Sequence, residues 1–136
     1  MTIDSPNFEG LDRWAFAQRR VEKPWGYEII WALTDRYAGK ILFVRAGQAL
    51  SLQFHNEKDE SWYVLSGRAQ LELGEVGQGV LNSEVITEGA SFHYAPGTVH
   101  RVTAIEDTTI LEVSTTELDD VVRLEDKYGR EGTSEP

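Results

Sequence analysis

The stretch LSLQFHNEKDESWYVL, from Leu50 to Leu65, has the pattern of two β-strands joined by a polar loop. Its apolar residues alternate with polar ones, and successive side chains of a strand point to opposite faces. Gln53 and His55 therefore share one face of the first strand. The polar segment 56–59 predicts a hairpin loop, which brings Glu60 at the start of the second strand back near His55. These three side chains are expected to lie close enough together to bind one common ligand.

Short strand-like runs, punctuated by glycine and proline, continue on both sides of this stretch. The expected runs are 27–33, 40–46, 49–55, 60–65, 68–73, 80–87, 91–95, 100–105 and 108–114. Many short strands with no convincing helix between them indicate an antiparallel sandwich or barrel. The later segment 117–128 fits a short helix or a last strand equally well. Large apolar side chains occupy both faces of the central strands. One face lines the barrel, and the other is expected to be covered by the second sheet, the N-terminal arm or another subunit, which favours a homodimer.

The two ends of the chain lack the strand-like residue pattern of the central part. Leu11 and Trp14 follow helical spacing, Arg19 and Arg20 suit the end of a helix dipole, and Pro24 would stop such a helix. The expected divisions are an N-terminal arm over 1–24, a β-barrel domain over 25–130 and a flexible tail over 131–136.

Composition limits the class of function. The chain has 136 residues with 23 acidic and 13 basic side chains, a net charge of −10, so it repels nucleic acids and anionic membranes on average. A local basic pocket for one small anion stays compatible with this charge. The absence of cysteine excludes disulfides, thiolate metal sites and a cysteine nucleophile. No membrane-length apolar run and no signal peptide are found, so a cytoplasmic protein is expected.

Two blocks of residues share the spacing of a known pair of motifs. The first block is Gly47, Gln53, His55, Glu60 and Gly67, and the second is Gly89, Ala95-Pro96-Gly97 and His100. They resemble the paired motifs of the cupin superfamily, small β-barrels whose motif residues hold a divalent metal. The resemblance puts Gln53, His55, Glu60 and His100 at the four metal-ligand positions. It implies an all-β fold, the cupin double-stranded β-helix or jelly-roll barrel, with a short N-terminal arm.

The chemistry of these four side chains suits a metal ion with open positions. Imidazole and carboxylate are good ligands for zinc, manganese, nickel or iron. The amide of Gln53 is a weak, neutral ligand that favours harder ions. Two nitrogens and two oxygens leave room for water or substrate oxygens, as Lewis-acid chemistry requires. One divalent ion is expected, with zinc or manganese first; His93 fits no ligand position and is expected behind the site or in the core.

Four stretches resemble one branch of the superfamily, the cupin domain of type II mannose-6-phosphate isomerases. They are Lys23–Glu28 (KPWGYE), Leu50–His55 (LSLQFH), Glu60–Gly67 (ESWYVLSG) and Val122–Arg130 (VRLEDKYGR). A glutamine ligand is usual in this branch. Asn56 and Lys58 stand where the branch usually has a second histidine and an arginine, and this difference bears on which sugar is accepted.

The resemblance implies a metal-dependent sugar-phosphate isomerase, which interconverts aldose and ketose phosphates through an enediolate held on the divalent metal. A base must then move a proton between neighbouring carbons, and Glu112 and His93 are the candidates. Trp62 shares a face with Glu60 and is the aromatic residue expected to stack on the sugar ring.

A substrate phosphate needs cationic partners. Arg130 is the first candidate, as a residue of the catalytic centre, and Arg123 is the next. Lys58 and Arg101 follow, because they lie near the ligands in the sequence.

Two other functions stay open. A non-catalytic sugar-binding or regulatory cupin would use the same barrel for recognition. A cupin dioxygenase is less favoured, because iron dioxygenases prefer histidine-rich ligand shells. For the isomerase and for the sugar-binding cupin, the expected partner is a small sugar or sugar phosphate, with no nucleic acid and no membrane.

Overall fold

The computed structural model describes residues 8–131, which consist mainly of β-strands. A 3₁₀-helix, η1 (Phe8–Trp14), precedes the strands. The strands are β1 (Arg19–Lys23), β2 (Gly26–Leu33), β3 (Ala38–Val44), β4 (Leu52–Phe54), β5 (Glu60–Ser66), β6 (Arg68–Glu75), β7 (Asn82–Thr87), β8 (Ser91–Tyr94), β9 (Thr98–Ala104), β10 (Thr108–Ser114) and β11 (Val122–Glu125).

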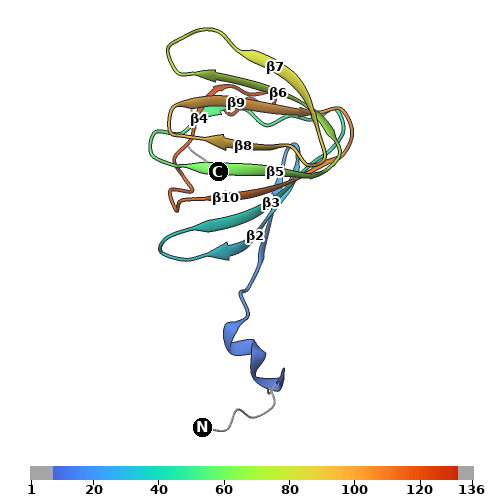
Figure 1. Ribbon diagram of the computed structural model, residues 1–136, viewed down its shortest axis with the longest axis vertical. Helices are drawn as coiled ribbons and strands as arrows, with labels where there is room; N and C mark the ends of the chain where they lie inside the picture. The colour runs from blue at the N-terminus through green and yellow to red at the C-terminus, as the bar shows by residue number, and fades with distance from the viewer. Residues whose placement is uncertain (1–7, 132–136) are drawn as a thin grey trace.

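The strands form two antiparallel sheets (Figure 1). One has the order β1-β2-β3-β10-β5-β8, and the other has the order β11-β4-β9-β6-β7. Strands from distant parts of the chain are neighbours, since β10 lies between β3 and β5, and β9 lies between β4 and β6. This interleaving of early and late strands is the jelly-roll arrangement, so the predicted cupin barrel is confirmed.

The hydrophobic core consists of inward-facing side chains from both sheets. Leu42, Val64 and Ile110 come from the six-stranded sheet, and Leu71 and Val102 come from the other; each is at most 3% exposed. Burial of such a side chain contributes about 1.5–3 kcal/mol. This apolar packing holds the two sheets together around the interior where the polar groups lie.

The predicted face of β5 is confirmed. Glu60, Trp62 and Val64 are buried, whereas Tyr63 and Leu65 are exposed. The predicted hairpin does not form, because β4 and β5 belong to different sheets and do not pair with each other. The loop that begins at His55 crosses from one sheet to the other, and it still brings Glu60 near His55.

The start of the chain differs from the helical expectation. The helix is a 3₁₀-helix that ends at Trp14, and Arg19 and Arg20 lie in β1 instead of a helix end. β1 pairs with β2 from Arg19 opposite Ile30 to Lys23 opposite Gly26. The reason is that a short helix is marginal in water, whereas pairing with β2 satisfies the backbone groups of β1.

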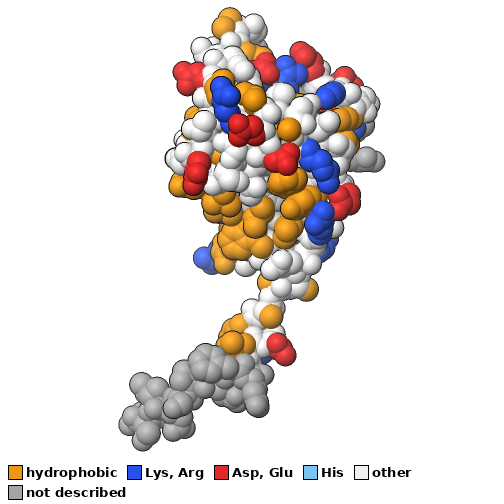
Figure 2. Space-filling view, turned by 90° about the vertical axis from the view of Figure 1, so that its right-hand side faces the viewer, with side chains coloured by type: hydrophobic (Ala, Val, Ile, Leu, Met, Phe, Trp, Pro, Cys, Tyr) orange, Lys and Arg blue, Asp and Glu red, His pale blue; other side chains and the backbone are white. Residues whose placement is uncertain are grey.

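The segment before β1 projects from the body of the molecule (Figure 1). We call residues 8–18 the projecting segment. Figure 2 shows hydrophobic side chains gathered on the body close to the place where this segment leaves it. Residues 1–7, the first part of the predicted arm, lie outside the described range.

The undecided segment 117–128 contains the strand β11. Val122 lies opposite Phe54 of β4, and Arg123 lies opposite Gln53. The predicted flexible tail lies, apart from residue 131, outside the described residues. Among residues 8–131, no helix is both long and apolar enough to cross a membrane.

Candidate metal centre

Three of the predicted ligands converge inside the barrel. His55 follows β4, Glu60 begins β5 and His100 lies in β9. Their ligand atoms all lie within 4.8 Å of one another, and all three side chains are buried. The Glu60 Oε1 atom lies 3.2 Å from His55 Nε2 and 2.9 Å from His100 Nε2. Two strands and the loop after β4 therefore bring one carboxylate and two imidazoles to a common point.

Backbone carbonyls orient both imidazoles. His55 Nδ1 donates to the carbonyl oxygen of Asp120, and His100 Nδ1 donates to that of Thr98 at 3.0 Å. A carbonyl oxygen only accepts, so each Nδ1 carries its proton and each Nε2 is directed toward Glu60. Hydrogen bonding from the other ring nitrogen is the arrangement that fixes histidine ligands in metal sites.

The donor set fits a divalent cation. His100 Nε2 is buried and makes no hydrogen bond of good geometry within the described residues, although Glu60 Oε1 is close. Two imidazole lone pairs facing a carboxylate repel it unless a proton or a cation lies between them. A divalent cation can be bound by the carboxylate and both imidazoles at once, whereas one proton can bridge only one imidazole and the carboxylate.

Gln53 lies in the same cavity as these three residues. It is directly opposite His100 in the pairing of β4 with β9. Its side-chain oxygen accepts a hydrogen bond from Ser51 Oγ at 3.3 Å. The amide is thus placed on the wall next to the cluster of His55, Glu60 and His100.

A buried ammonium group lies behind the cluster. Lys58 Nζ is 3.1 Å from Glu60 Oε2 and 3.4 Å from Glu112 Oε2, and Trp62 Nε1 donates to Glu112 Oε1 at 3.0 Å. Burial alone would lower the pKa of Lys58, but Glu112 and Glu60 raise it, so this lysine is charged.

The two carboxylates have opposite pKa shifts. Burial would raise the pKa of Glu60, but the neighbouring imidazoles and the Lys58 charge hold it well below its usual range. Burial, and then repulsion from Glu60, raises the pKa of Glu112. Glu60 is therefore the charged carboxylate of the cluster, and Glu112 is the carboxylate that takes a proton more readily.

A second group of charged side chains, most of them cationic, lines the same cavity. Lys40 Nζ lies 3.4 Å from Glu28 Oε2, and Lys23 Nζ lies 3.9 Å from Glu28 Oε1. Arg123 and Arg130 line the same cavity. Burial lowers the pKa of Lys23, and the carboxylate of Glu28 partly opposes this shift. The nearby positive charges of Lys40, Arg130 and Arg123 lower the pKa of Lys23 further. The potential around this group is therefore positive.

The balance of charge in the cavity is opposite to that of the whole chain. Within the described residues, five cationic and three anionic side chains line a space of about 530 Å³, counted with its open mouth. The whole sequence has a net charge of −10. Such a local excess of cations attracts a small anion.

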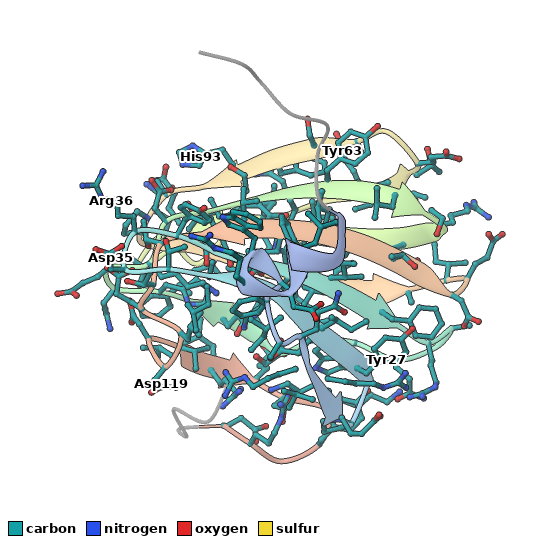
Figure 3. The ribbon with its side chains drawn as sticks, turned by 90° about the horizontal axis from the view of Figure 1, so that it is seen from below. Tyr27, Asp35, Arg36, Tyr63, His93 and Asp119 are labelled. Carbon is teal, nitrogen blue, oxygen red and sulfur yellow. The ribbon has the colours of Figure 1, made fainter. Side chains whose placement is uncertain are left out.

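Three predicted site residues lie apart from the cavity. Trp62 is a core residue beneath it, 2% exposed. Arg101 is on the outside of β9, with Nε 2.8 Å from Glu72 Oε1. His93 points away from the barrel on β8 and lies 2.5 Å from Asp59 (Figure 3).

Asp120 is a residue that the sequence interpretation missed. Besides its carbonyl contact with His55, its carboxylate accepts the backbone N–H groups of Asn56 at 3.0 Å, Glu57 at 2.6 Å and Lys58 at 2.9 Å. It therefore clamps the loop that carries His55 and Lys58. The only available signal was a pair of aspartates in the undecided segment, which does not indicate such a partner.

Lys23, Glu28 and Lys40 were also missed. Glu28 and Lys40 occupy buried positions that alternate with apolar ones on β2 and β3. A charged residue at an inward position of a strand is a signal that could have identified them.

The comparison with protein families gives one match that spans most of the chain. The family described as mannose-6-phosphate isomerase C-terminal matches residues 12–126. The xanthan biosynthesis protein XanB of Xanthomonas campestris is 36% identical over 118 residues, covering 82% of this chain and 24% of XanB. The mannose-1-phosphate guanylyltransferase ManC of Salmonella typhimurium is 36% identical over 122 residues, covering 82% of this chain and 23% of ManC. This chain thus spans about a quarter of the length of these relatives.

Solved structures share the fold at low sequence identity. CapF, a capsular polysaccharide assembling protein of Staphylococcus aureus, has a TM-score of 0.72 and 15% identity over 84% of this chain and 33% of its own. KdgF of Halomonas sp. has a TM-score of 0.60 and 20% identity over 74% and 87% of the two chains. Oxalate decarboxylase of Bacillus subtilis, described with Mn(II) centres, has a TM-score of 0.66 and 20% identity, and the match covers 79% of this chain and 30% of the decarboxylase.

Proposed function

This chain belongs to the mannose-6-phosphate isomerase C-terminal family, and from this premise we propose that it is a metal-dependent isomerase of sugar phosphates, acting between aldose and ketose forms. The observation that carries the proposal is the meeting of His55, Glu60 and His100 in a cavity whose lining has more cationic than anionic side chains. The first feature suits a Lewis acid, and the second suits a phosphate.

His55, Glu60, His100 and the adjacent Gln53 would hold the metal, with zinc or manganese expected. A bound divalent ion supplies Lewis-acid polarisation of the substrate's carbonyl and neighbouring hydroxyl oxygens. The carbonyl partners of the two imidazoles keep their Nε2 atoms aimed at the ion's position.

Glu112 is the group that we assign to proton transfer between the two carbons. It lines the cavity, whereas the other candidate base, His93, lies outside it. Trp62 and Lys58 hold its carboxylate in place. In this role Glu112 takes the proton from one carbon and returns it to the next.

Arg130 and Arg123 are the proposed partners of the substrate phosphate. They come from the C-terminal segment and line the cavity together with Lys23 of β1. Arg130 is held by Asp126, with its Nε 2.9 Å from Asp126 Oδ2. The guanidinium is therefore pre-oriented, which reduces the entropy lost on binding an anion.

The direct test is the conversion of mannose 6-phosphate into fructose 6-phosphate, followed with a coupled assay after loading the protein with zinc or manganese. Glu112→Gln should lower kcat by about 100-fold or more, because general acid–base catalysis contributes at least this much. His93→Ala is the matched control and should keep kcat. Absence of conversion with both metals would refute the isomerase proposal.

The phosphate assignment has a test of its own. Arg130→Gln should raise KM for a phosphosugar about tenfold or more while the metal content stays unchanged, because one charge-assisted contact is lost. Arg101→Gln removes an arginine on the outside of the barrel and should leave KM unchanged. Equal KM values for the two variants would contradict the assignment.

A non-catalytic sugar-binding or regulatory role is the second candidate. It is favoured by the ion pairs of Lys58 with both Glu60 and Glu112, which engage the carboxylate that catalysis requires. Binding of mannose 6-phosphate measured by calorimetry, without any conversion, would support this role.

A further inference from the structure

A row of charged side chains crosses the inner face of the six-stranded sheet. The neighbouring strands β2, β3, β10 and β5 contribute Glu28, Lys40, Glu112 and Glu60, each at most 5% exposed. Lys40 is directly opposite Glu112 in the pairing of β3 with β10, and directly opposite residues point to the same side of a sheet. On β1, Lys23 continues the row, with its Nζ 3.9 Å from Glu28 Oε1. The row therefore leads from the ligand Glu60, across Glu112, to the cationic group around Lys23.

The pair of Glu28 and Lys40 takes part neither in the candidate metal centre nor in the proposed phosphate contacts. Lys40 Nζ donates to Glu28 Oε1 at 3.5 Å and to Glu28 Oε2 at 3.4 Å, and both residues line the cavity. Replacing a buried ion pair by apolar side chains of similar size is often neutral or stabilising, so stability alone does not account for the pair. An ammonium next to a carboxylate supplies a proton donor and a proton acceptor at one point of the cavity wall.

The chemistry of sugar phosphates calls for such a donor and acceptor. A hexose phosphate is mainly cyclic, whereas isomerisation acts on the open-chain carbonyl form. To open the ring, a base takes the proton of the anomeric hydroxyl and an acid protonates the ring oxygen. In a pyranose 6-phosphate the ring oxygen lies between the anomeric carbon and the carbon that bears the phosphate-carrying arm. The acid must therefore lie between the group that acts on the carbonyl carbons and the groups that bind the phosphate.

The strand order places the pair at this position. Lys40 of β3 and Glu28 of β2 lie between Glu112 of β10, the proposed base of isomerisation, and Lys23 of β1, which lines the cavity with Arg130. Neighbouring strands are about 4.8 Å apart, so Lys40 is one strand spacing from Glu112. The order of the groups along the sheet thus matches the order of the reacting atoms along a cyclic sugar phosphate.

We propose that Lys40 and Glu28 open the ring of a cyclic sugar phosphate and thereby exchange its anomers. Glu28 takes the proton of the anomeric hydroxyl, and the electron pair of that O–H bond forms the carbonyl. The bond from the anomeric carbon to the ring oxygen breaks, and the ring oxygen takes a proton from Lys40. The proton on Glu28 then returns to Lys40 across 3.4 Å, which restores both charges. The reverse steps on the other face of the carbonyl close the ring as the other anomer.

The substrate class rests on the proposed function, so ring opening is measured apart from isomerisation. The probe is mannose 6-phosphate, and exchange NMR follows the interconversion of its α and β anomers with zinc-loaded Glu112→Gln protein, in which isomerisation is slowed. This protein should raise the exchange rate above that in buffer, in proportion to its concentration. Adding Glu28→Gln with Lys40→Met should lower the acceleration by about 100-fold or more, because general acid–base catalysis contributes at least this much.

The double replacement removes both charges, so neither is left buried without its partner. Its matched control is Glu72→Gln with Arg101→Met, which removes an ion pair on the outside of the barrel and should keep the acceleration. Near-UV circular dichroism verifies that each variant is folded. Calorimetry with inorganic phosphate should give the same affinity with and without the pair.

Three outcomes would overturn the assignment of ring opening to this pair. They are an exchange rate equal to that in buffer, an undiminished acceleration in the variant without the pair, and phosphate binding weakened about tenfold in that variant, which would make the pair a phosphate contact. The isomerase proposal fails separately. Wild-type protein that exchanges the anomers but forms no fructose 6-phosphate supports ring opening and refutes isomerisation, and conversion without accelerated exchange does the opposite.

Discussion

Single side chains in the candidate metal centre owe their direction to other residues of the chain. The ring of His100 stacks on Tyr94, with centroids 4.4 Å apart and planes at 14°, while its Nδ1 is bound to a carbonyl group. His55 has a similar carbonyl anchor at Asp120. Ligands held in this way lose little freedom when an ion binds, so they are pre-organised for it.

His100→Ala should lower the affinity for zinc by at least about 100-fold. Removing a residue that only hydrogen-bonds to a ligand already weakens metal binding, and removing the ligand itself should weaken it more. Isothermal titration calorimetry of the metal-free protein measures this affinity. His93→Ala removes an exposed imidazole outside the cavity, and an equal loss of affinity in this control would contradict the assigned site.

Connections between strands matter as much as the strands in positioning the site. The loop from β4 to β5 carries one ligand and Lys58, and it is held by Asp120 from the segment between β10 and β11. The tight turn between β5 and β6 depends on Gly67, whose φ is +101°. Each of these features depends on a part of the chain remote in sequence.

Asp120→Ala should lower the free energy of unfolding by about 1–2 kcal/mol at pH 7, after allowance for solvent screening. Burial by itself would raise the pKa of Asp120, but the three N–H donors lower it. A lowered folded-state pKa gives stability that is complete above the ordinary value of about 3.9 and disappears as the pH falls through the folded-state value. Urea unfolding should thus show a constant difference from pH 7 to pH 5 that shrinks below about pH 4. A difference that is independent of pH would exclude the charged clamp.

Gly67→Ala should destabilise the chain more than Gly89→Ala does. Both glycines have positive φ, which costs an alanine about 1–2 kcal/mol. A Cβ at Gly67 would lie 2.4 Å from the Asp107 carbonyl oxygen, whereas a Cβ at Gly89 would meet nothing within 4 Å. We expect a loss above about 3 kcal/mol at Gly67 in urea unfolding, and equal losses at the two positions would contradict this account.

The whole molecule combines an acidic exterior with a cavity in which cations predominate. The two sheets enclose that cavity, and strands of both sheets contribute its walls. Charged side chains such as Glu28 and Lys40 are tolerated inside because they are paired. The ion expected between Glu60 and the two imidazoles would link segments from both sheets, so its binding should stabilise the whole fold.

Thermal unfolding therefore provides the last prediction. Zinc or manganese at 100 times its dissociation constant should stabilise the fold by about 2.7 kcal/mol, which corresponds to a rise in Tm of roughly 10 °C for a domain of this size. An excess of EDTA should reverse the rise, and His100→Ala should not show it. An unchanged Tm with every divalent metal would argue against a metal centre in this cavity.

Many elements were predictable because their determinants are local. The alternation in Leu50–Leu65 predicts two strands and the faces of their side chains, and the strand 108–114 has the predicted bounds. β1 was not predictable, because Arg19 and Arg20 suit the end of the helix that the spacing of residues 11–18 indicates, and only the pairing of residues 19–23 with β2 makes them part of a strand. The clamp at Asp120 was not predictable for another reason: a surface carboxylate has no local signal for its partners, and only the folded chain brings Asp120 to the backbone N–H groups of the 56–58 loop.

Strand periodicity is a local property, so the short strands and the shared face of Gln53 and His55 were predictable from the residues alone, and the resemblance of the two motif blocks added the barrel and its four candidate ligands. Closure of the barrel decided the rest: that Lys23, Glu28 and Lys40 join Arg130 in one cavity, while His93 and Arg101 lie outside it. The physical reason is that proximity between strands distant in sequence arises only when both sheets pack around one core.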